Sequence, residues 1–594
     1  MNNKRIKSAY LILLVCIFSA AFSADAINLR KQGAWYESAY ATWEEIEGAH
    51  SYQVFYSGVG LEDVPVDEPL IRRYPDEYRV DVPGLEPGAY TLRIVALNEN
   101  QEEMSHCTTD LLEVKAFKRE GFAFTEGVVP GAYQSNGRLK DGVKILYVSQ
   151  ENINHVSCEV SDGKKKIMYT GLGNILTAYS KGRDKTPLLI RVIGCIKAAD
   201  YEGLKDGNYL NFQGNNNSDR MLENITLEGI GNDATLHGFG VCFKRTKGIE
   251  VRNLGIMLFG DDGISMDTDN YHNWIHHNDI FYGATATGSD ADQVKGDGSI
   301  DLKYRSTRIN IDYNHFFDSG KVMGCGGATK EEVNLLLSFH HNWFDHTDSR
   351  CPRLNHSTAH IYNNYYDGVS VYGIGCTEVS NAFIEANHFR NCQRPMMIAG
   401  QGTDRIYASN PDKGTFSGQT GGMSKAFNNK VEGDIEIRLL YQTDNAEQYD
   451  AWLVSSREEK LPETAKAYKG GWVYDNFDTS EDMYVSHPDA PEDVADIVTQ
   501  SAGRLEGGDI KWTFDNEKDD RNHDLNTALK NVLLSYQSRL MAIQGISSPS
   551  TALAPPCINE TQAIYFDLQG RSIAEPEKGV YLMKQGNIYI KRMK

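Results

Sequence analysis

The sequence predicts an all-β protein in which a right-handed parallel β-helix is preceded by a small β-sandwich and followed by a short C-terminal tail module. Three observations support this fold class. The chain of 594 residues is too long for one ordinary core. Its 54 glycines and 32 tyrosines, against 17 prolines, favour strands joined by many turns. A strand followed by an asparagine and then an aromatic or aliphatic residue also recurs from about residue 222 onward.

The recurring pattern indicates a solenoid with one coil per repeat. Successive pattern asparagines lie 25, 36, 28, 22, 23 and 42 residues apart, so insertions in three gaps lengthen a basal period of 22–25 residues. Short coils without an intervening helix predict a parallel β-helix. We expect each asparagine amide to satisfy backbone groups and the neighbouring asparagine, forming a ladder without a catalytic role. The asparagines are Asn253, Asn278, Asn314, Asn342, Asn364, Asn387 and Asn429.

Insertions in a solenoid emerge on one face and often build its binding surface. We expect this of residues 279–296, 318–331 and 401–421. The apolar spacing of residues 523–541 predicts an amphipathic helix that covers an end of the β-helix.

The β-helix is assigned to residues 119–545, and the sandwich to residues 27–118. In ATWEEIEGAHSYQVFYSG, a tryptophan and a turn are followed by alternating Tyr52, Val54 and Tyr56. The run VPGLEPGAYTLRIVALN shows the same alternation after a Pro-Gly turn. These strand signals and the tryptophan-to-tyrosine layout resemble a fibronectin type III domain, which implies a spacer or a binding appendage.

Both ends of the chain indicate export. Three basic residues, an apolar run and small residues predict a secretory signal peptide over residues 1–26, and the run is too short to span a bilayer. A linker rich in Ser, Pro and Ala at 546–557 leads to residues 558–594, which resemble the sorting tail of many exported proteins. We therefore expect a secreted, periplasmic or cell-surface protein without a transmembrane segment.

Charge and cysteine content exclude several classes of partner. The formal net charge of −21 argues against nucleic acid but allows an anionic substrate at a locally cationic site. Nine cysteines follow Cys16; their number is odd, their spacing is irregular, and no CxxC pair suggests zinc. We predict mostly buried free thiols, although one or two disulfides could form after export.

The segment KGDGSIDLKYRS, residues 295–306, places two carboxylates close together. In a strand, Asp297, Asp301 and Lys303 would point to one side while the apolar residues point to the other. Like charges this close repel each other unless they are protonated, solvated or bridged by a cation. The residue types alone leave two alternatives, a solvated strand face or a cation site.

Three motifs follow one another here: GDDGISMDTDNYHNWIHH, then DGSIDLKYRSTRINIDYNHFFDSGKVMGCGG, then LLLSFHHNWFDHTDSRCPRLNHSTAHIYNNYY. Their succession resembles polysaccharide lyase family 1, the pectate lyases. The resemblance covers roughly residues 120–430, and its most specific part is 260–366. It implies a monomeric, calcium-dependent enzyme that cleaves polygalacturonate by β-elimination to 4,5-unsaturated oligogalacturonides.

The resemblance also implies a calcium site. Asp262, in DDGISM, matches the aspartate that precedes the family's W-[IV]-D-H motif, and the next coil supplies Asp297 and Asp301. Hard oxygen ligands from adjacent coils suit Ca²⁺, which accepts irregular coordination completed by water and substrate. A bound cation would explain why the two aspartates are tolerated together.

Four cations complete the predicted site. Lys321, in FFDSGKVMG, matches the family's substrate-binding lysine, and Arg350, in DSRCPRLNH, matches its proton acceptor; we assign both to catalysis. Lys303 and Arg353 join Lys321 as predicted substrate-binding residues. Cations beside a uronate carboxylate withdraw charge as the C5 proton leaves. Because a guanidinium is a weak base, we expect an alkaline optimum.

Two positions depart from the family pattern. The W-[IV]-D-H motif reads Trp274-Ile275-His276-His277, so a histidine replaces its aspartate. A second arginine is often found five residues after the proton acceptor, where this chain has Asn355. Arg353 is near enough in the sequence to replace it. Both departures could change affinity or the preferred degree of pectin methylation.

Three other functions fit parts of the sequence. A galacturonan hydrolase could use Asp297 and Asp301 as acid and base, but Lys321 and Arg350 would then have no role. A calcium-independent pectin lyase acting on methylated pectin would need fewer carboxylates. A catalytically inactive pectin-binding protein is compatible with the sandwich and the two departures.

Overall fold

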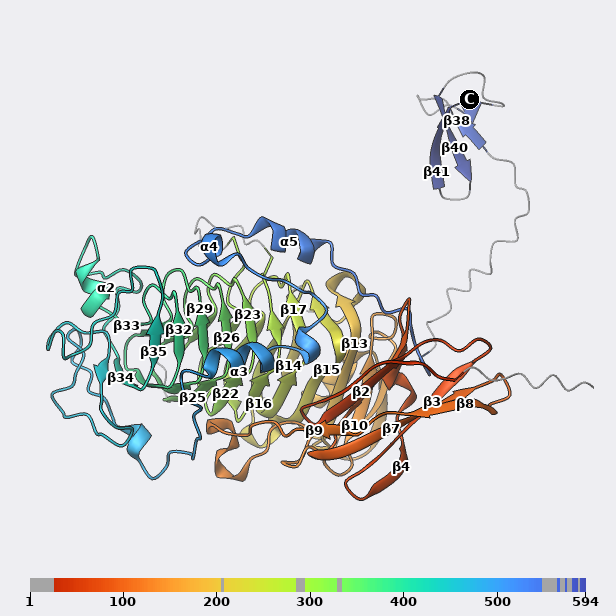
Figure 1. Ribbon diagram of the computed structural model, residues 1–594, viewed down its shortest axis with the longest axis horizontal. Coiled ribbons are helices and arrows are strands. Elements are labelled where there is room, and N and C mark those ends of the chain that lie inside the picture. The colour runs from red at the N-terminus through yellow and green to blue at the C-terminus, as the bar shows by residue number, and fades with distance from the viewer. Residues whose placement is uncertain are drawn as a thin grey trace, which may run out of the picture. The chain divides into compact units, whose positions relative to one another are not determined.

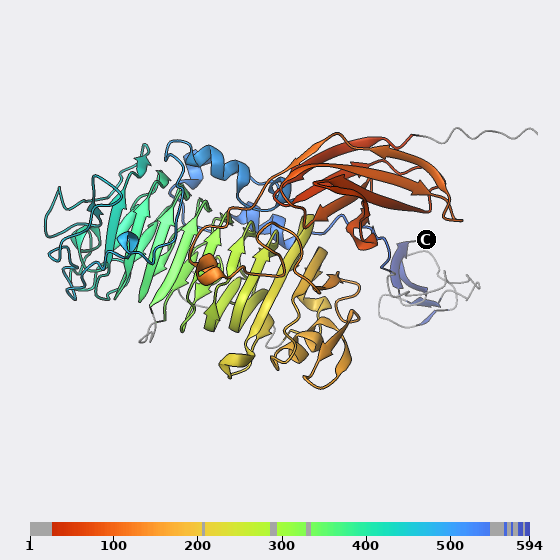
Figure 2. The ribbon, with the colours of Figure 1, turned by 90° about the horizontal axis from the view of Figure 1, so that it is seen from below.

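Three short strands in each turn of the chain build the largest sheet of this protein. The computed structural model describes residues 26–204, 208–284, 294–327 and 334–546, together with four strands near the C-terminus. In it, 25 strands form one continuous sheet whose strands pair in parallel with those of the neighbouring coils (Figure 1; Figure 2). The prediction of a parallel β-helix is therefore confirmed.

Each coil contributes one strand to each of three rows, and the long strands β15 and β16 each span two rows. The first row comprises β14 (Tyr209–Gln213), β16 (Gly240–Arg252), β18 (Ile264–Tyr271), β21 (Ile300–Leu302), β24 (Met323–Cys325), β27 (Arg353–Leu354), β30 (Ile374–Cys376) and β33 (Met396–Ile398). The second row comprises β10 (Lys144–Val148), β13 (Leu188–Lys197), β15 (Leu222–His237), β19 (Trp274–His276), β22 (Ile309–Asp312), β25 (Leu335–His340), β28 (Ser357–Tyr362), β31 (Asn381–Glu385), β34 (Met423–Phe427) and β36 (Trp452–Leu453). The third row comprises β17 (Gly255–Met257), β20 (Asp279–Ile280), β23 (His315–Phe317), β26 (Trp343–Asp345), β29 (Tyr365–Asp367), β32 (His388–Arg390) and β35 (Lys430–Glu432).

Alternation along the short strands separates the core from the outer surface. In β21, Ile300 and Leu302 are fully buried in the long apolar core enclosed by the three rows. Asp301 between them faces outward because successive side chains of a strand point to opposite sides. The next coil repeats this arrangement in β24, where Met323 and Cys325 are buried and Gly324 between them is half-buried, so the first row presents an outer face that can hold a site.

The predicted asparagine ladder forms at the turn between the second and third rows. The amide of Asn278 donates to Asn314 at 3.0 Å, and Asn314 donates to Asn342 at 3.1 Å. The chain of bonds continues through Asn364 and Asn387 to Asn429. Each of these amides also donates to backbone carbonyls, so the ladder satisfies buried groups at each turn.

Asn253 is the exception to this prediction. It has a φ of 55° and lies one residue before the ladder position. Leu254 occupies the ladder position instead, and its backbone N–H donates to the side-chain oxygen of Asn278. Its amide donates to the carbonyls of Gly229 and Gly231 at 2.7 and 2.8 Å. The motif contains one asparagine per coil, but here it occupies the left-handed corner, which asparagine tolerates well.

The residues before the β-helix, joined by one short strand that follows it, form two antiparallel sheets that share one core. The first sheet contains β1 (Leu29–Trp35), β2 (Ser38–Trp43), β6 (Tyr78–Pro83), β5 (Ile71–Arg73) and β37 (Ala542–Ile543). The second contains β4 (Leu61–Pro65), β3 (Ser51–Gly58), β7 (Gly88–Leu97), β8 (Glu103–Thr108) and β9 (Leu112–Val114). Ile193 and Ile230 of the β-helix extend their common core, so the sandwich packs against the first coils. Its likeness to a fibronectin type III domain stays a prediction.

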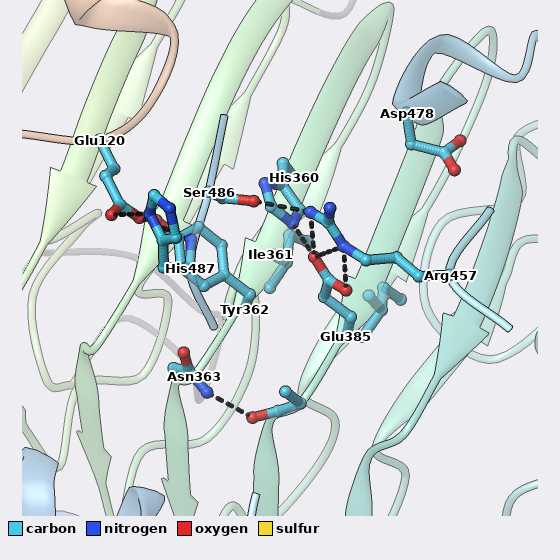
Figure 3. Close-up of polar contacts among 12 residues, drawn as sticks. Glu120, His360, Ile361, Tyr362, Asn363, Glu385, Arg457, Asp478, Ser486 and His487 are labelled. Atoms are coloured by element: carbon cyan, nitrogen blue, oxygen red, sulfur yellow. Dashed lines mark hydrogen bonds and ion pairs between the residues drawn. The ribbon is translucent and has the colours of Figure 1, made fainter. Parts of the chain in front are cut away.

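The chain after the last coil runs back along the β-helix toward the sandwich (Figure 1). Figure 3 shows one of its attachments to the second row. Arg457 donates to Glu385 at 2.8 Å and to the Ser486 hydroxyl at 2.6 Å, while His360 lies 2.7 Å from the same carboxylate. Further along, the helix α3 (Val494–Ser501) packs against Tyr365 of β29.

A helix does form within residues 523–541, but the prediction that it covers an end of the β-helix is wrong. It is α5 (Thr527–Leu534), and its Leu529 and Leu533 pack on the side of the third row. Outward-facing apolar side chains after β20, including Phe281 and Tyr282, provide the surface that this helix buries.

Several smaller elements and predictions complete the description. The remaining elements are β11 (Ser157–Ser161), β12 (Lys166–Thr170), α1 (Leu172–Tyr179), α2 (Gly402–Ile406) and α4 (Asn516–Asp519). The eight cysteines in the described part of the chain are free. No helix among the described residues is long and apolar enough to cross a bilayer.

The predicted signal peptide and linker fall almost wholly outside the described residues. Residues 547–594 form a separate unit. Its described strands make an antiparallel sheet in the order β39 (Ser572–Ile573), β38 (Ile564–Phe566), β40 (Val580–Gln585) and β41 (Ile588–Met593).

Candidate active site

On the outer face of the first row, predicted site residues from neighbouring coils lie side by side. Asp301 on β21 pairs in register with Ser265 on β18 and with Gly324 on β24. Gly324 in turn pairs with Arg353 on β27. The parallel register therefore places an acidic and a basic side chain on either side of a glycine, which leaves space between them.

A cluster of carboxylates lies just before the N-terminal ends of β18 and β21. Asp261, Asp262 and Asp297 each offer an oxygen, and these atoms all lie within 4.8 Å of one another. Asp262 is only 2% exposed, whereas Asp261 is exposed. Two of the three predicted metal ligands, Asp262 and Asp297, are thus brought together, and Asp261 joins them.

The third predicted ligand, Asp301, lies close to Asp262 but is paired with Lys303. The Lys303 ammonium is 3.2 Å from an Asp301 oxygen and 3.3 Å from Asp262. Burial, and secondly the Asp301 charge, raise the pKa of Asp262 to about 7. The carboxylates are therefore crowded enough that a neighbouring cation stabilises their charged forms.

Glycines keep the space between these carboxylates open. A Cβ on Gly298 would lie 2.6 Å from Asp301 Oδ1 and 3.1 Å from Asp262 Oδ1. The backbone N–H of Gly324 donates to Asp301 Oδ1 at 2.9 Å and orients that carboxylate. Hard carboxylate oxygens around a space that a single methyl group would fill fit a cation such as Ca²⁺.

Two cations lie on the coils that follow. Lys321 forms a bridge in register with Ser349, the residue before Arg350, and the Met323 N–H donates to the Arg350 carbonyl at 2.8 Å. Lys321 is 7% exposed, and Arg350 has a φ of 61°, which is uncommon outside glycine. Within the described residues, neither the Lys321 ammonium nor the Arg350 guanidinium has a hydrogen-bond or ion-pair partner. Both charges are available to an external anion.

Arg353 and Asn355 meet at one residue of an insertion. Gln419, within the 401–421 insertion, accepts hydrogen bonds from the Arg353 guanidinium and, at 3.4 Å, from the Asn355 amide. Burial lowers the pKa of Arg353, and the nearby charge of Arg350 acts in the same direction. Gln419 therefore holds Arg353, the predicted replacement for the family's second arginine, beside the predicted site.

His276, the first departure from the family motif, lies elsewhere. It is fully buried on β19 in the second row, stacked on Trp274 with ring centroids 3.6 Å apart. Its Nε2 lies 3.2 Å from Glu250, and Phe117 packs on its ring. His276 therefore packs beneath the segment that links the sandwich to the β-helix. It does not lie on the outer face of the first row, where the other predicted site residues are.

Comparison with known proteins identifies the family. The family pattern described as "Pectate lyase" matches residues 111–431, which include every residue of the carboxylate cluster and all four cations. The chain belongs to the pectate lyase family. A pectate trisaccharide-lyase from Bacillus licheniformis is 27% identical over 239 residues, covering 40% of this chain and 65% of that relative. Pectate lyase 2 from Pectobacterium carotovorum is 29% identical over 287 residues, covering 46% and 69%.

The match therefore spans slightly less than two thirds of the Bacillus licheniformis relative. Among solved structures, a pectate lyase from Bacillus sp. N165 in complex with trigalacturonate is 18% identical, with a TM-score of 0.45. That alignment covers 65% of this chain and 99% of the other.

Sequence reasoning missed two residues that lie beside the predicted site residues. Asp261 is adjacent to Asp262 in DDGISM, and the doubled aspartate was the signal that could have indicated it. Gln419 lies more than sixty residues from its partners Arg353 and Asn355. No local pattern marks it, because only the coiling of the chain brings that insertion to the first row.

A second group of possible ligands is already paired. The Asp345 carboxylate is hydrogen-bonded to His315 Nε2 at 2.8 Å and to His346 Nδ1 at 2.7 Å. Asp367 is paired with Arg390, which also binds Asp520 of the C-terminal segment. This network joins the third row to the C-terminal segment, and its charges compensate one another without a metal.

Proposed function

We propose that this protein is a calcium-dependent pectate lyase that cleaves polygalacturonate by β-elimination to 4,5-unsaturated oligogalacturonides. The observation that carries the proposal is the pair of cations Lys321 and Arg350, which have no partner among the described residues and lie on coils next to a carboxylate cluster. A carboxylate cluster with room for a cation and these two positive charges together suit a polyanionic substrate. Membership of the pectate lyase family supports the same assignment.

Asp262 and Asp297, together with Asp261 and Asp301, would hold the calcium ion. Their oxygens come from two adjacent coils, and the space kept by Gly298 lies between them. When bound, calcium would withdraw negative charge from the substrate carboxylate beside the reacting carbon.

The cationic residues of the chain would orient the substrate and accept its proton. Lys321 would bind the carboxylate of the reacting galacturonate, and Lys303 and Arg353 would bind carboxylates of neighbouring units. Arg350, in its uncharged form, would accept the C5 proton; the electrons of that C–H bond form the C4–C5 double bond as the C4–O bond breaks. The departing oxygen takes up a proton, and no water is consumed.

Analysis of the new chain ends tests this reaction class. Polygalacturonate is incubated with the protein in calcium, and the products are identified by mass spectrometry and NMR. The proposal expects one unsaturated non-reducing end for each bond cleaved, together with one new reducing end on the other fragment. New saturated ends that carry the mass of an added water would instead show hydrolysis.

One observation favours a second candidate, a calcium-independent lyase acting on methylated pectin. The Lys303 ammonium already lies between Asp262 and Asp301. A neutral ester needs less charge compensation, so this internal cation could suffice. Faster cleavage of highly methylated pectin, unaffected by chelator, would support this candidate.

We also propose that the protein is exported and acts as a monomer. The basic and apolar N-terminal sequence supports export, and polygalacturonate is an extracellular polymer. The N-terminal sandwich would serve as a spacer or polysaccharide-binding appendage, and the tail would direct sorting or attachment.

A further inference from the structure

We propose that Lys295 is a positioning residue that holds the coils carrying Asp297, Lys321 and Arg350 in register. This inference rests on the proposed lyase function. Lys295 is a lysine in the β20–β21 insertion that the reaction itself does not use.

Lys295 is buried between two aspartates. It is 2% exposed, and its ammonium lies 2.5 Å from Asp318 Oδ1 and 3.0 Å from Asp348 Oδ1. Both aspartates are themselves buried, at 4% and 6% exposure. A lysine this deep is rare unless it is paired, so the two carboxylates account for its burial.

The three members of this cluster stand next to three site residues along the chain. Lys295 lies two residues before Asp297, Asp318 three before Lys321, and Asp348 two before Arg350. One ammonium therefore joins the segments that present a proposed metal ligand, the substrate-binding lysine and the proposed base.

Backbone bonds show that these segments lie side by side. The Asp348 N–H donates to the Ser319 carbonyl at 2.9 Å, and the Ser299 N–H donates to the Lys321 carbonyl at 3.2 Å. The hydroxyls of Ser299 and Ser319 are 2.7 Å apart. The ammonium adds a charged link to these hydrogen bonds between the coils.

Further hydrogen bonds fix the two aspartates. The Tyr282 hydroxyl donates to Asp318, and the Ser370 hydroxyl donates to Asp348 at 2.8 Å. The backbone N–H of Asn526, just before α5, donates to the same Tyr282 oxygen at 3.1 Å. The cluster thus reaches from the insertion through four coils to the C-terminal segment, and each member has a defined orientation.

The consequence is catalytic as well as structural. Loss of the ammonium would leave two buried carboxylates facing each other, and they would separate or take up a proton. Either response would move the segments that carry Lys321 and Arg350. A small displacement of reacting groups has a large effect on turnover, of the order of a hundredfold for about 1 Å.

The test compares Lys295→Met with Lys295→Arg and a control, Lys425→Met. Lys425 is a second fully buried lysine, 2.5 Å from Asp478, in the second row. Each variant is assayed for unsaturated product from polygalacturonate, for the affinity of calcium alone by calorimetry, and for thermal unfolding. At temperatures well below the Tm of the variant, we expect Lys295→Met to lower kcat by about a hundredfold. Lys295→Arg should recover part of the lost kcat. Lys425→Met should lower Tm and leave kcat unchanged.

A fourth variant covers the case in which Lys295→Met does not fold. The combination of Lys295→Met, Asp318→Asn and Asp348→Asn removes all three charges and so avoids repulsion. It should fold, and it should still lower kcat because the charged link between the three segments is absent. Wild-type kcat in Lys295→Met or in the triple variant would overturn the inference while the lyase function stands. A wild-type protein that forms no unsaturated product would overturn both.

Discussion

The Lys303 ammonium lies 3.2 Å from the Asp301 carboxylate, and it also reaches Asp262 at 3.3 Å. Both aspartates are predicted calcium ligands. The Lys303 ammonium therefore lies beside the space that Gly298 keeps open for calcium. A lysine and a divalent cation at this position compete electrostatically. Lys303 would therefore move toward the substrate when calcium binds, which agrees with its proposed role.

This competition predicts that Lys303→Met binds calcium more tightly than the wild type. Two unit charges about 4 Å apart interact by about 1 kcal/mol even in bulk water, which corresponds to an affinity change of about fivefold. Calorimetric titration with calcium measures the change. Unchanged or weaker binding in Lys303→Met would contradict the competition.

The carboxylate cluster predicts that Asp261 contributes to calcium binding, although the sequence analysis assigned its neighbour Asp262, and not Asp261, as a ligand. We expect Asp261→Asn to weaken calcium affinity about tenfold and Asp262→Asn to weaken it more, because each removes a charged oxygen ligand. Asp269→Asn is the matched control, since Asp269 lies on β18, the strand that follows Asp261 and Asp262, but is paired with Arg305. Equal affinities in Asp261→Asn and the control would exclude Asp261 from the site.

Because the Arg350 guanidinium has no partner in the described ranges of the chain, we predict that Arg350 can be replaced without loss of stability. Arg350→Lys should lower kcat by a factor of about 10² to 10⁴, the usual range for a proton-transfer group. Its Tm should stay within about a degree of the wild type, because no hydrogen bond within the described residues is lost. Differential scanning calorimetry and initial rates measure the two quantities. A large fall in Tm would show that Arg350 is a structural residue.

The network at the C-terminal segment predicts a pH-dependent stability. Burial lowers the pKa of His346, but the hydrogen bond with Asp345 and the Asp520 carboxylate, 3.1 Å from Nε2, outweigh burial and raise the pKa to about 10. An unfolded histidine titrates near about 6.5. The contribution of this pair is therefore complete below about pH 6.5 and is lost as the pH rises through about 10.

The corresponding measurement compares the wild type with His346→Gln in thermal unfolding from pH 6 to pH 10.5. The difference in Tm should be largest near pH 6 and should shrink toward zero at the alkaline end. His106→Gln is the control, because His106 and Glu103 form an exposed pair. A difference that stays constant with pH would show that His346 acts through packing alone.

Features that depend on local repetition could be predicted from the sequence. The ladder from Asn278 to Asn429 follows from one asparagine per coil, and the alternation around Asp301 follows from the period of a strand. Asn253 shows the limit, because a one-residue shift between ladder and corner leaves the motif unchanged in the sequence. The structure also brings Asp262 and Asp297 together, which three motifs in order had suggested.

Features that depend on the insertions could not be predicted in the same way. Lys295 and Gln419 reach the site because their coils return to the first row, and nothing in their neighbouring residues indicates their partners. The position of α5 depends on the apolar side chains of Phe281 and Tyr282, which face outward only in the folded coil. Long-range packing decided each of these cases.

The most direct test of the central claim is ultraviolet absorbance during incubation with polygalacturonate at alkaline pH, first with calcium and then with excess chelator. The account predicts that absorbance of the unsaturated product grows with calcium, stops with chelator and returns when calcium is restored. New reducing ends without this absorbance, or no cleavage of any pectin, would contradict it.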